Sequence, residues 1–425
     1  MAWSCRAGKL AVARYELDEG LALLHQAVRL ESVPERQAEL WEEIGHANAL
    51  RFDGEAFRDA METAIALAGP SGELYSELAL QTVVRSGMWN PRPNQEFVEG
   101  WIDRALELSE DGSPAHAKAL ASAALERGDE AAARQLHALA VRSGDVDLRS
   151  NALSALTDVA WYAGDREGAR RWVEERLALV PVLSDPDDCH FAEMTAACVY
   201  IALARLPEAA AACGRLEALV QGLTPHHRLH AVYCRLMVET VFGHWDRVRE
   251  LTQMVEHTVK ANEAAPCTGN AATLLFCAVA SERTGDEAES IRLENEAATQ
   301  TLEGQRSYYL AYWLRLMLAR ADLPGLERLV ATIDLDHLAE GPYRYDQPPA
   351  VLDALVMLRD HESIERVAPG WLRHETYAEP FALRALGIAR VDAELLDRAS
   401  TTFRSIGLGW RADETDRWRA ETTTG

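Results

Sequence analysis

The sequence predicts an all-α protein, a right-handed solenoid of about eleven helix pairs, from three observations. Ala and Leu dominate the composition while β-branched residues are sparse, a balance that favours helices over strands. Gly and Pro fall between the periodic segments rather than inside them. At 425 residues the chain exceeds the usual size of a single core, and its even composition favours growth by repeats over division into unlike domains.

The clearest repeat unit lies within residues 149–180. Its first predicted helix runs into Gly164, which can adopt the left-handed conformation that ends a helix. Asp165 follows and is suited to cap the next helix, which ends near Pro181. This unit therefore predicts a helix, a tight turn and a second helix.

Similar turns recur at a mean spacing of about 37 residues, which is inside the range of helical-pair repeats. They are expected at residues 18–20, 53–54, 90–93, 128–129, 164–165, 205–207, 243–244, 285–286, 322–325, 360–361 and 391–392. Prolines such as Pro34, Pro114 and Pro225 mark the joints between pairs. We expect the repeat domain to cover residues 1–408, with a polar capping helix and tail at 409–425.

The charge and composition exclude several classes of partner. A formal net charge of -24, without a local Lys and Arg cluster, disfavours direct binding to nucleic acid or anionic lipid. The seven cysteines are scattered and odd in number, which suits a reducing compartment. Neither a signal peptide pattern nor a long apolar run is present in the sequence, so we expect a cytoplasmic protein without a membrane span.

One segment carries a resemblance to a known family. Trp41-Glu42-Glu43-Ile44-Gly45 resembles the tetratricopeptide repeat (TPR) signature of Trp, two residues, Leu and Gly, and the alanines at 56, 60 and 64 resemble its alanine-spaced second helix. Asn48 stands where the family places Tyr, and most later copies lack both the Trp and the Gly. In period and turn chemistry the resemblance covers nearly the whole chain, and it implies a TPR-like solenoid that binds proteins.

At a finer level the chain resembles the C-terminal repeat region of large bacterial ATP-binding signalling and transcription regulators, both LuxR-type and cyclase-linked. Residues 6–11 and 403–408 look like the two edges of such a region. The resemblance implies a role in signal transduction and association with an ATP-binding or cyclase module. Gly8-Lys9 is not itself a phosphate-binding loop, because Leu10 follows where Ser or Thr is needed.

The TPR resemblance also implies where a partner would bind. The first helix of each pair lines the concave face of such stacks, so exposed polar and aromatic residues on first helices are candidates for contacting a protein or peptide. These candidates are Lys118, Ser122, Asn151, Ser154, Asp158, Trp161, Tyr162, His230, Tyr233, Tyr308 and Arg315. For Trp161 and Tyr162, packing between repeats is the competing interpretation.

Two segments contain residue types that bind metals. Asp185, Asp187, Asp188, Cys189 and His190 lie within six residues, but zinc usually takes two spaced pairs of ligands and no second pair is near in the sequence. An Asp-rich helix start explains the carboxylates through the helix dipole. The histidines at 226, 227 and 230 look similar to a ligand cluster, but two of them are expected at a solvated helix start. We therefore predict no metal and no cofactor.

The predicted function is that of a non-catalytic scaffold, of protein-interaction or regulatory type. One alternative is a small-ligand or peptide sensor module of a bacterial signalling system. The other is an enzyme in which helix pairs close into an α/α toroid, as in many glycosidases, with Asp158, Glu239 and Glu282 as available carboxylates. The paired-aspartate motif of terpene cyclases is missing from the sequence, and the loops are short for a sugar cleft.

Overall fold

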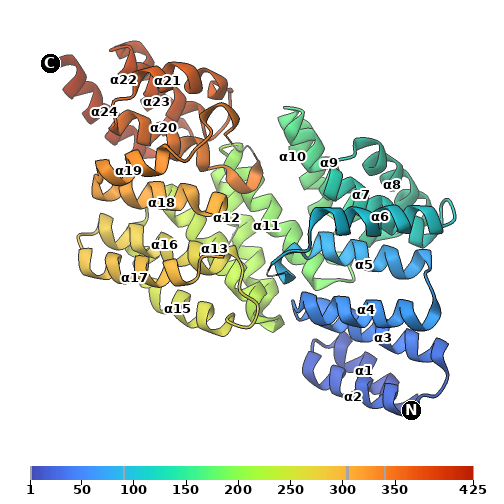
Figure 1. Cartoon of the computed structure of the whole chain (residues 1–425). Coiled ribbons are helices and arrows are strands. Elements are labelled where there is room, and N and C mark those ends of the chain that lie inside the picture. The colour runs from blue at the N-terminus through green and yellow to red at the C-terminus, as the bar shows by residue number, and fades with distance from the viewer. Residues whose placement is uncertain (1, 90, 303–305, 339–340, 425) are drawn as a thin grey trace. The chain divides into compact units, whose positions relative to one another are not determined.

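The computed structural model describes residues 2–89, 91–302, 306–338 and 341–424. Every regular element within these ranges is a helix, and the helices follow one another as eleven pairs and a terminal helix, α24 (Figure 1). The predicted all-α fold built from successive helix pairs is confirmed within these ranges. The chain divides into two compact units, which are described separately.

Unit 1 comprises residues 1–192, 219–227 and 264–267. Its helices are α1 (Ala2–Ala13), α2 (Leu17–Leu30), α3 (Pro34–Leu50), α4 (Gly54–Ala68), α5 (Gly72–Val84), α6 (Gln95–Leu108), α7 (Pro114–Arg127), α8 (Glu130–Ser143), α9 (Val146–Tyr162) and α10 (Arg166–Leu177). The first residues of α11 (Pro186–Ala202) and of α13 (Pro225–Phe242) also belong to unit 1.

Unit 2 comprises residues 193–218, 228–263 and 268–425. It holds the remainder of α11 and α13, together with α12 (Leu206–Leu219), α14 (Trp245–Glu250), α15 (Thr252–Ala261), α16 (Thr268–Arg283), α17 (Glu287–Thr299), α18 (Arg306–Arg320), α19 (Leu323–Val330), α20 (Gln347–Met357), α21 (His361–Val367), α22 (Glu379–Ala389), α23 (Ala393–Ser405) and α24 (Gly409–Thr424). In one pair the second helix is interrupted at Leu251, which separates α14 from α15.

Ten of the eleven turns within pairs share one backbone geometry. In each of these turns, the residue directly before the N-cap of the second helix has a positive φ, between 53° and 84°. These residues are Tyr15, Phe52, Gly128, Gly164, Ala204, Gly243, Gly285, Ala321, Arg359 and Val391. The predicted cap is confirmed at Asp165, whose carboxylate accepts a hydrogen bond from the Gly168 amide at 2.8 Å. The remaining turn, between α5 and α6, is longer and includes the 3-10 helix η1 (Ser86–Met88).

The predicted first turn, at residues 18–20, is wrong. Asp18 and Glu19 lie in the first turn of α2, and the chain instead reverses at Tyr15. Acidic side chains are favoured at a helix N-terminus because the backbone amides there carry partial positive charge, so these residues begin the helix and do not form the turn.

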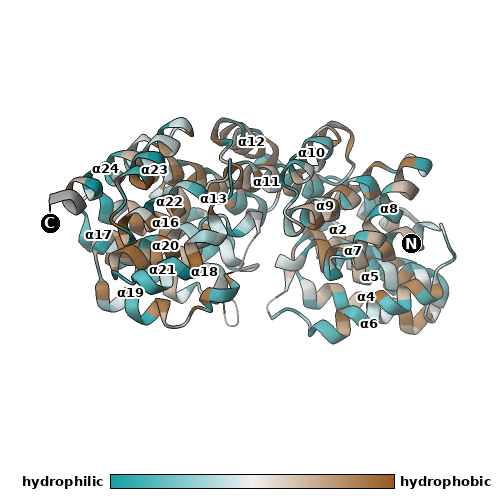
Figure 2. Ribbon diagram, turned by 90° about the horizontal axis from the view of Figure 1, so that it is seen from above, coloured by the Kyte–Doolittle hydropathy of each residue, from teal (hydrophilic) through white to brown (hydrophobic). Residues whose placement is uncertain are grey.

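The glycine of the TPR-like signature has a packing role. A Cβ atom at Gly45 would lie only 3.0 Å from Met61 Sδ, so the missing side chain lets α3 approach α4 closely. Ile44 on α3 and Phe57 and Ala64 on α4 are buried. Most helices carry both hydrophobic and hydrophilic residues (Figure 2), as expected for helices that bury one face and expose the other.

One face of the C-terminal helix α24 is buried, although the sequence predicts a polar capping helix. Arg411, Ala412 and Thr415 are buried on one of its faces. The division of the chain into a repeat domain and a cap at residue 408 stays a prediction. No helix in the described part of the chain is long and apolar enough to cross a membrane.

Candidate functional site

Polar side chains from three successive first helices of unit 1 meet around Glu77 on α5. The Lys118 ammonium on α7 donates a hydrogen bond to Glu77 Oε2 at 2.7 Å, and Gln81 donates to Glu77 Oε1 at 2.8 Å. Glu42 on α3 interacts electrostatically with both Glu77 and Lys118, and His46 interacts with Glu77. We call Glu42, His46, Glu77 and Lys118 the first-helix cluster.

The two carboxylates of the cluster differ in how well they are neutralised. Burial alone would raise the pKa of Glu77, but Lys118, His46 and Gln81 together outweigh burial, and the pKa is lowered. Burial raises the pKa of Glu42, and the nearby Glu77 charge raises it further. Among the described residues no basic side chain lies within ion-pair distance of Glu42, and Lys118, which interacts with it electrostatically, is paired with Glu77. The cluster therefore holds one half-buried carboxylate that would gain from an added cation.

A chain of hydrogen bonds continues from the cluster along α5. Glu77, Gln81 and Arg85 are spaced by four residues and so share one helical face. Arg85 donates to Gln81 and forms ion pairs with Asp185 and Asp187, in the latter case over 3.2 Å between Nε and Oδ2. Arg85 is almost fully buried, so its charge depends on these two carboxylates for neutralisation.

This series of hydrogen bonds and ion pairs ends at histidines on α11 and α13, within unit 1. Asp187 Oδ1 lies 2.9 Å from His227 Nε2 and 3.8 Å from His190 Nδ1. Burial alone would raise the pKa of Asp187, but Arg85 and His227 lower it well below its usual value. Burial lowers the pKa of His190 to about 3, so this imidazole is neutral at ordinary pH.

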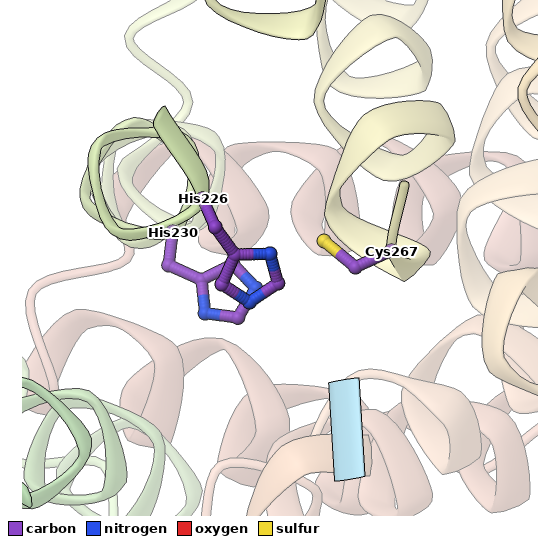
Figure 3. Close-up of side chains that lie close together, drawn as sticks. All are labelled: His226, His230 and Cys267. Carbon is purple, nitrogen blue, oxygen red and sulfur yellow. The ribbon is translucent and has the colours of Figure 1, made fainter. Parts of the chain in front are cut away.

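The expectation of solvated histidines at the start of α13 is wrong. His226 is 2% exposed and His227 is fully buried. The His226 ring stacks on Phe52, with centroids 3.9 Å apart, because the left-handed turn between α3 and α4 presents that aromatic side chain. Figure 3 shows His226 and His230 one turn apart on α13, and Cys267 on the segment leading into α16.

Four of the predicted contact residues are buried, which corrects the expectation that they are exposed. They are Ser122, Ser154, Trp161 and Arg315. The Ser154 hydroxyl accepts a hydrogen bond from Arg176 of α10 at 3.1 Å, so this face of α9 packs on its own partner helix. The Ser122 hydroxyl donates to the Lys118 carbonyl at 3.0 Å, within the same helix.

The other predicted contact residues are at least partly accessible. Tyr162 and Tyr308 are exposed, whereas Lys118, Asn151, Asp158, His230 and Tyr233 are half-buried. The Tyr233 hydroxyl lies 2.6 Å from that of Tyr312, within unit 2. Whether any of these side chains contacts a partner stays a prediction.

The chain matches no model of a known protein family and no curated protein sequence. Solved structures that are similar to it include the crystal structure of yeast Tom70, with 12% sequence identity and a TM-score of 0.38, over 99% of this chain and 96% of the Tom70 chain. A likeness of that degree supports no inference about fold or function. Both are therefore inferred from the residues and contacts of this chain alone.

In unit 2 the first helices are joined by a buried network of ion pairs. Arg315 on α18 pairs with Asp353 on α20 at 2.6 Å, and Arg384 on α22 pairs with Asp353 and, at 3.1 Å, with Glu414 on α24. Arg411 on α24 also pairs with Glu414, at 2.8 Å. These charges neutralise one another, so Arg315 serves the packing of unit 2.

Asp158, Glu239 and Glu282 are the carboxylates that were considered for a toroidal enzyme. Glu239 and Glu282 are paired with basic side chains, whereas Asp158 lies in the other unit. Glu239 accepts from Arg235 Nε at 2.9 Å and lies 2.7 Å from His244 Nδ1. Glu282 accepts from Arg320 Nε at 3.2 Å. Asp158 belongs to unit 1, where burial raises its pKa to about 6 although Arg176 opposes the shift.

Glu42, Glu77 and Arg85 are functional candidates that were not predicted from the sequence. The spacing of Glu77, Gln81 and Arg85 was an available signal, since polar residues four apart on a first helix indicate a shared face. Glu42 occupies one of the two unspecified positions of the TPR-like signature, which defines only the Trp, Leu and Gly positions. None of the three side chains is exposed, whereas the predicted contact residues were chosen as exposed ones.

Proposed function

We propose that the chain is a non-catalytic, regulatory protein-binding scaffold, and that a basic segment of its partner binds at the first-helix cluster of unit 1. The observation that carries this proposal is the environment of Glu42. Its carboxylate is half-buried beside a second carboxylate, and the ammonium of the cluster, on Lys118, is paired with Glu77.

A Lys or Arg side chain from a partner would supply the charge that Glu42 lacks. A charge-assisted hydrogen bond in a half-buried site is stronger than the same bond in water, because fewer water molecules compete for the carboxylate. Contact with exposed Glu39, on the same helix, would extend the acidic surface. The proposed ligand is therefore a segment with at least one basic residue.

The charge of the whole chain supports the same choice of partner. A net charge of -24 attracts basic partners over long range and repels acidic ones. Such attraction weakens as salt screens it, over about 8 Å at physiological ionic strength. Binding through the cluster should therefore weaken as the salt concentration rises.

The resemblance to bacterial regulators extends the proposal to the partner's identity. We place the chain in a cytoplasmic signalling system, where an ATP-binding or cyclase module is the candidate partner. Asn151 and Tyr162 on α9, half-buried and exposed respectively, are the predicted contacts that would flank the cluster within unit 1.

Affinity capture with matched variants tests the proposal. The purified chain serves as bait in a native lysate, in wild-type form and as Glu42→Gln, with Glu62→Gln as the control, because Glu62 is an exposed carboxylate on the second helix α4. We expect partners that bind wild type and Glu62→Gln equally and bind Glu42→Gln about tenfold more weakly, as for loss of one charge-assisted hydrogen bond.

Two outcomes would contradict the proposal. Equal losses in the Glu42 and Glu62 variants would mean that charge alone, and not the cluster, determines binding. If wild type captures nothing above background, the scaffold proposal fails and the small-ligand sensor becomes the better account.

A further inference from the structure

Asp187, His190 and His227 bring three ligand-type atoms together inside unit 1. A carboxylate oxygen and one ring nitrogen from each histidine all lie within 4.8 Å of one another. The measured pairs are 2.9 Å from Asp187 Oδ1 to His227 Nε2 and 3.8 Å from Asp187 Oδ1 to His190 Nδ1. Ligand atoms around tetrahedral zinc are separated by about 3.4 Å, given metal to ligand distances near 2.1 Å. Shifts of about half an ångström would bring Asp187 Oδ1 to that separation from each of the two histidine nitrogens.

From this arrangement we propose that Asp187, His190 and His227 form a binding site for zinc or a similar divalent transition metal. Two imidazoles and one carboxylate are a ligand set that such metals favour. His227 is fully buried, and the other two side chains are nearly so. The site has three protein ligands, and a water molecule would fill the fourth position.

The residues around the three ligands hold them in suitable orientations. His227 Nδ1 lies 2.7 Å from Thr224 Oγ1, so the ring can donate from Nδ1 and leave Nε2 for the metal. Metal-binding histidines usually make such a second hydrogen bond. Arg85 Nε contacts Asp187 Oδ2 at 3.2 Å, which turns the other oxygen, Oδ1, toward the two histidines.

The charges near the site permit a divalent cation. Arg85 contributes one positive charge, whereas Asp185 and Asp187 contribute two negative charges. Since the metal-binding form of each histidine is neutral, the net charge before metal binding is negative. Asp185 therefore compensates Arg85 and leaves the charge of Asp187 for the metal.

A metal at this position would join segments that are distant in the sequence. Asp187 and His190 begin α11, while His227 begins α13, and the contact between Asp187 and His227 spans 40 residues. The prediction of no metal depended on ligands close together in the sequence, so it could not include this pairing. Because the site is buried and closes a long loop, bound metal should stabilise unit 1.

Metal titration of the full chain tests the proposal. The protein is prepared without a histidine tag, treated with a chelator, and titrated with Zn²⁺ in competition with a coloured chelator. We expect one equivalent bound by wild type with a rise in melting temperature, and at least about 100-fold weaker binding by His190→Gln and His227→Gln. Far-UV circular dichroism establishes that each variant is folded.

His226→Gln and Cys267→Ser are the matched controls, since both residues belong to the neighbouring group of ligand-type side chains. Both should keep the wild-type affinity. Co²⁺ added to wild type gives a second readout that needs no variant, namely the absorption of four-coordinate Co²⁺ without a thiolate charge-transfer band. No stoichiometric metal in wild type, a thiolate band, or loss of binding only in the control variants would each overturn the proposal.

Discussion

Six of the ten left-handed turn residues are not glycine, although this conformation strains side chains that carry a Cβ atom. Tyr15, Phe52, Ala204, Ala321, Arg359 and Val391 hold these positions. The strain is tolerated because the helices on both sides fix the geometry of the turn. These residues therefore mark positions where a single substitution should add stability.

Val391→Gly should raise the free energy of unfolding by about 1 kcal/mol, because it removes the strain of a β-branched residue at φ 53°. The Val391 side chain is 66% exposed, so little packing is lost. Urea denaturation measures the change. Gly164→Ala is the converse control, since a Cβ atom there would meet open space and only the φ of 79° opposes it. A loss of stability in Val391→Gly would contradict the argument.

The raised pKa of Asp158 should make the stability of the folded protein depend on pH. Burial raises its pKa to about 6 from the usual 3.8, so between about pH 4 and pH 6 the folded state holds more protons than the unfolded state. Its contribution to stability therefore falls as the pH rises through that window. Asp158→Asn should stabilise the protein at pH 7.5 by about 1 to 2 kcal/mol, discounted because the side chain is only partly buried.

Urea denaturation of wild type and Asp158→Asn at pH 7.5 and pH 4 checks this prediction. The advantage of the variant should be nearly absent at pH 4, where wild-type Asp158 is protonated in the folded state. An advantage that is equal at both pH values would mean that the titration of Asp158 is not its source.

Buried ion pairs connect successive first helices in unit 2. Arg384 on α22 is fully buried and pairs with Asp353 and Glu414. Arg384→Met would leave these carboxylates without part of their neutralising charge, at a cost of about 3 to 5 kcal/mol. Thermal denaturation should detect the loss.

Arg390→Met is the control for this substitution, because Arg390 follows the same helix and pairs with Glu365 on the surface at 2.7 Å. Exposed pairs contribute about 0 to 1 kcal/mol. Similar losses in the two variants would contradict the role assigned to the buried pairs.

The elements themselves could be predicted from the sequence, because helix ends are determined by local chemistry. The Gly164-Asp165 turn shows this, since a residue that tolerates positive φ is followed by one that caps the next helix. The contacts between helices could not be predicted in the same way. Arg315 is a residue type that is usually exposed, but it is buried here by pairing with Asp353, which lies 38 residues away in the sequence. The same is true of His227 and Asp187, whose contact depends on the fold.

Each of the two units has its own polar network. Unit 1 contains the series of hydrogen bonds and ion pairs that runs from Lys118 through Arg85 to His227. Unit 2 contains the ion pairs around Asp353. In a repeat protein each pair is stabilised by its neighbours, so substitutions should act within their own unit.

We therefore expect unfolding in two steps. Asp165→Ala, which removes a helix cap in unit 1 at a cost of about 1 kcal/mol, should shift one transition, and Arg384→Met should shift the other. Differential scanning calorimetry of the three proteins resolves the transitions. A single transition that moves in both variants would mean that the units unfold together.

Contact between the first-helix cluster and a basic segment of a partner can be detected by photo-crosslinking. A photoreactive residue is placed at Glu42 in one protein and at Glu62 in another, because these positions lie on the first and second helix of one pair. After irradiation in native lysate, we expect a crosslinked protein from position 42 and not from 62, with the crosslink next to a Lys or Arg of the partner. Crosslinks of equal yield from both positions, or crosslinks only to acidic segments, would contradict the account.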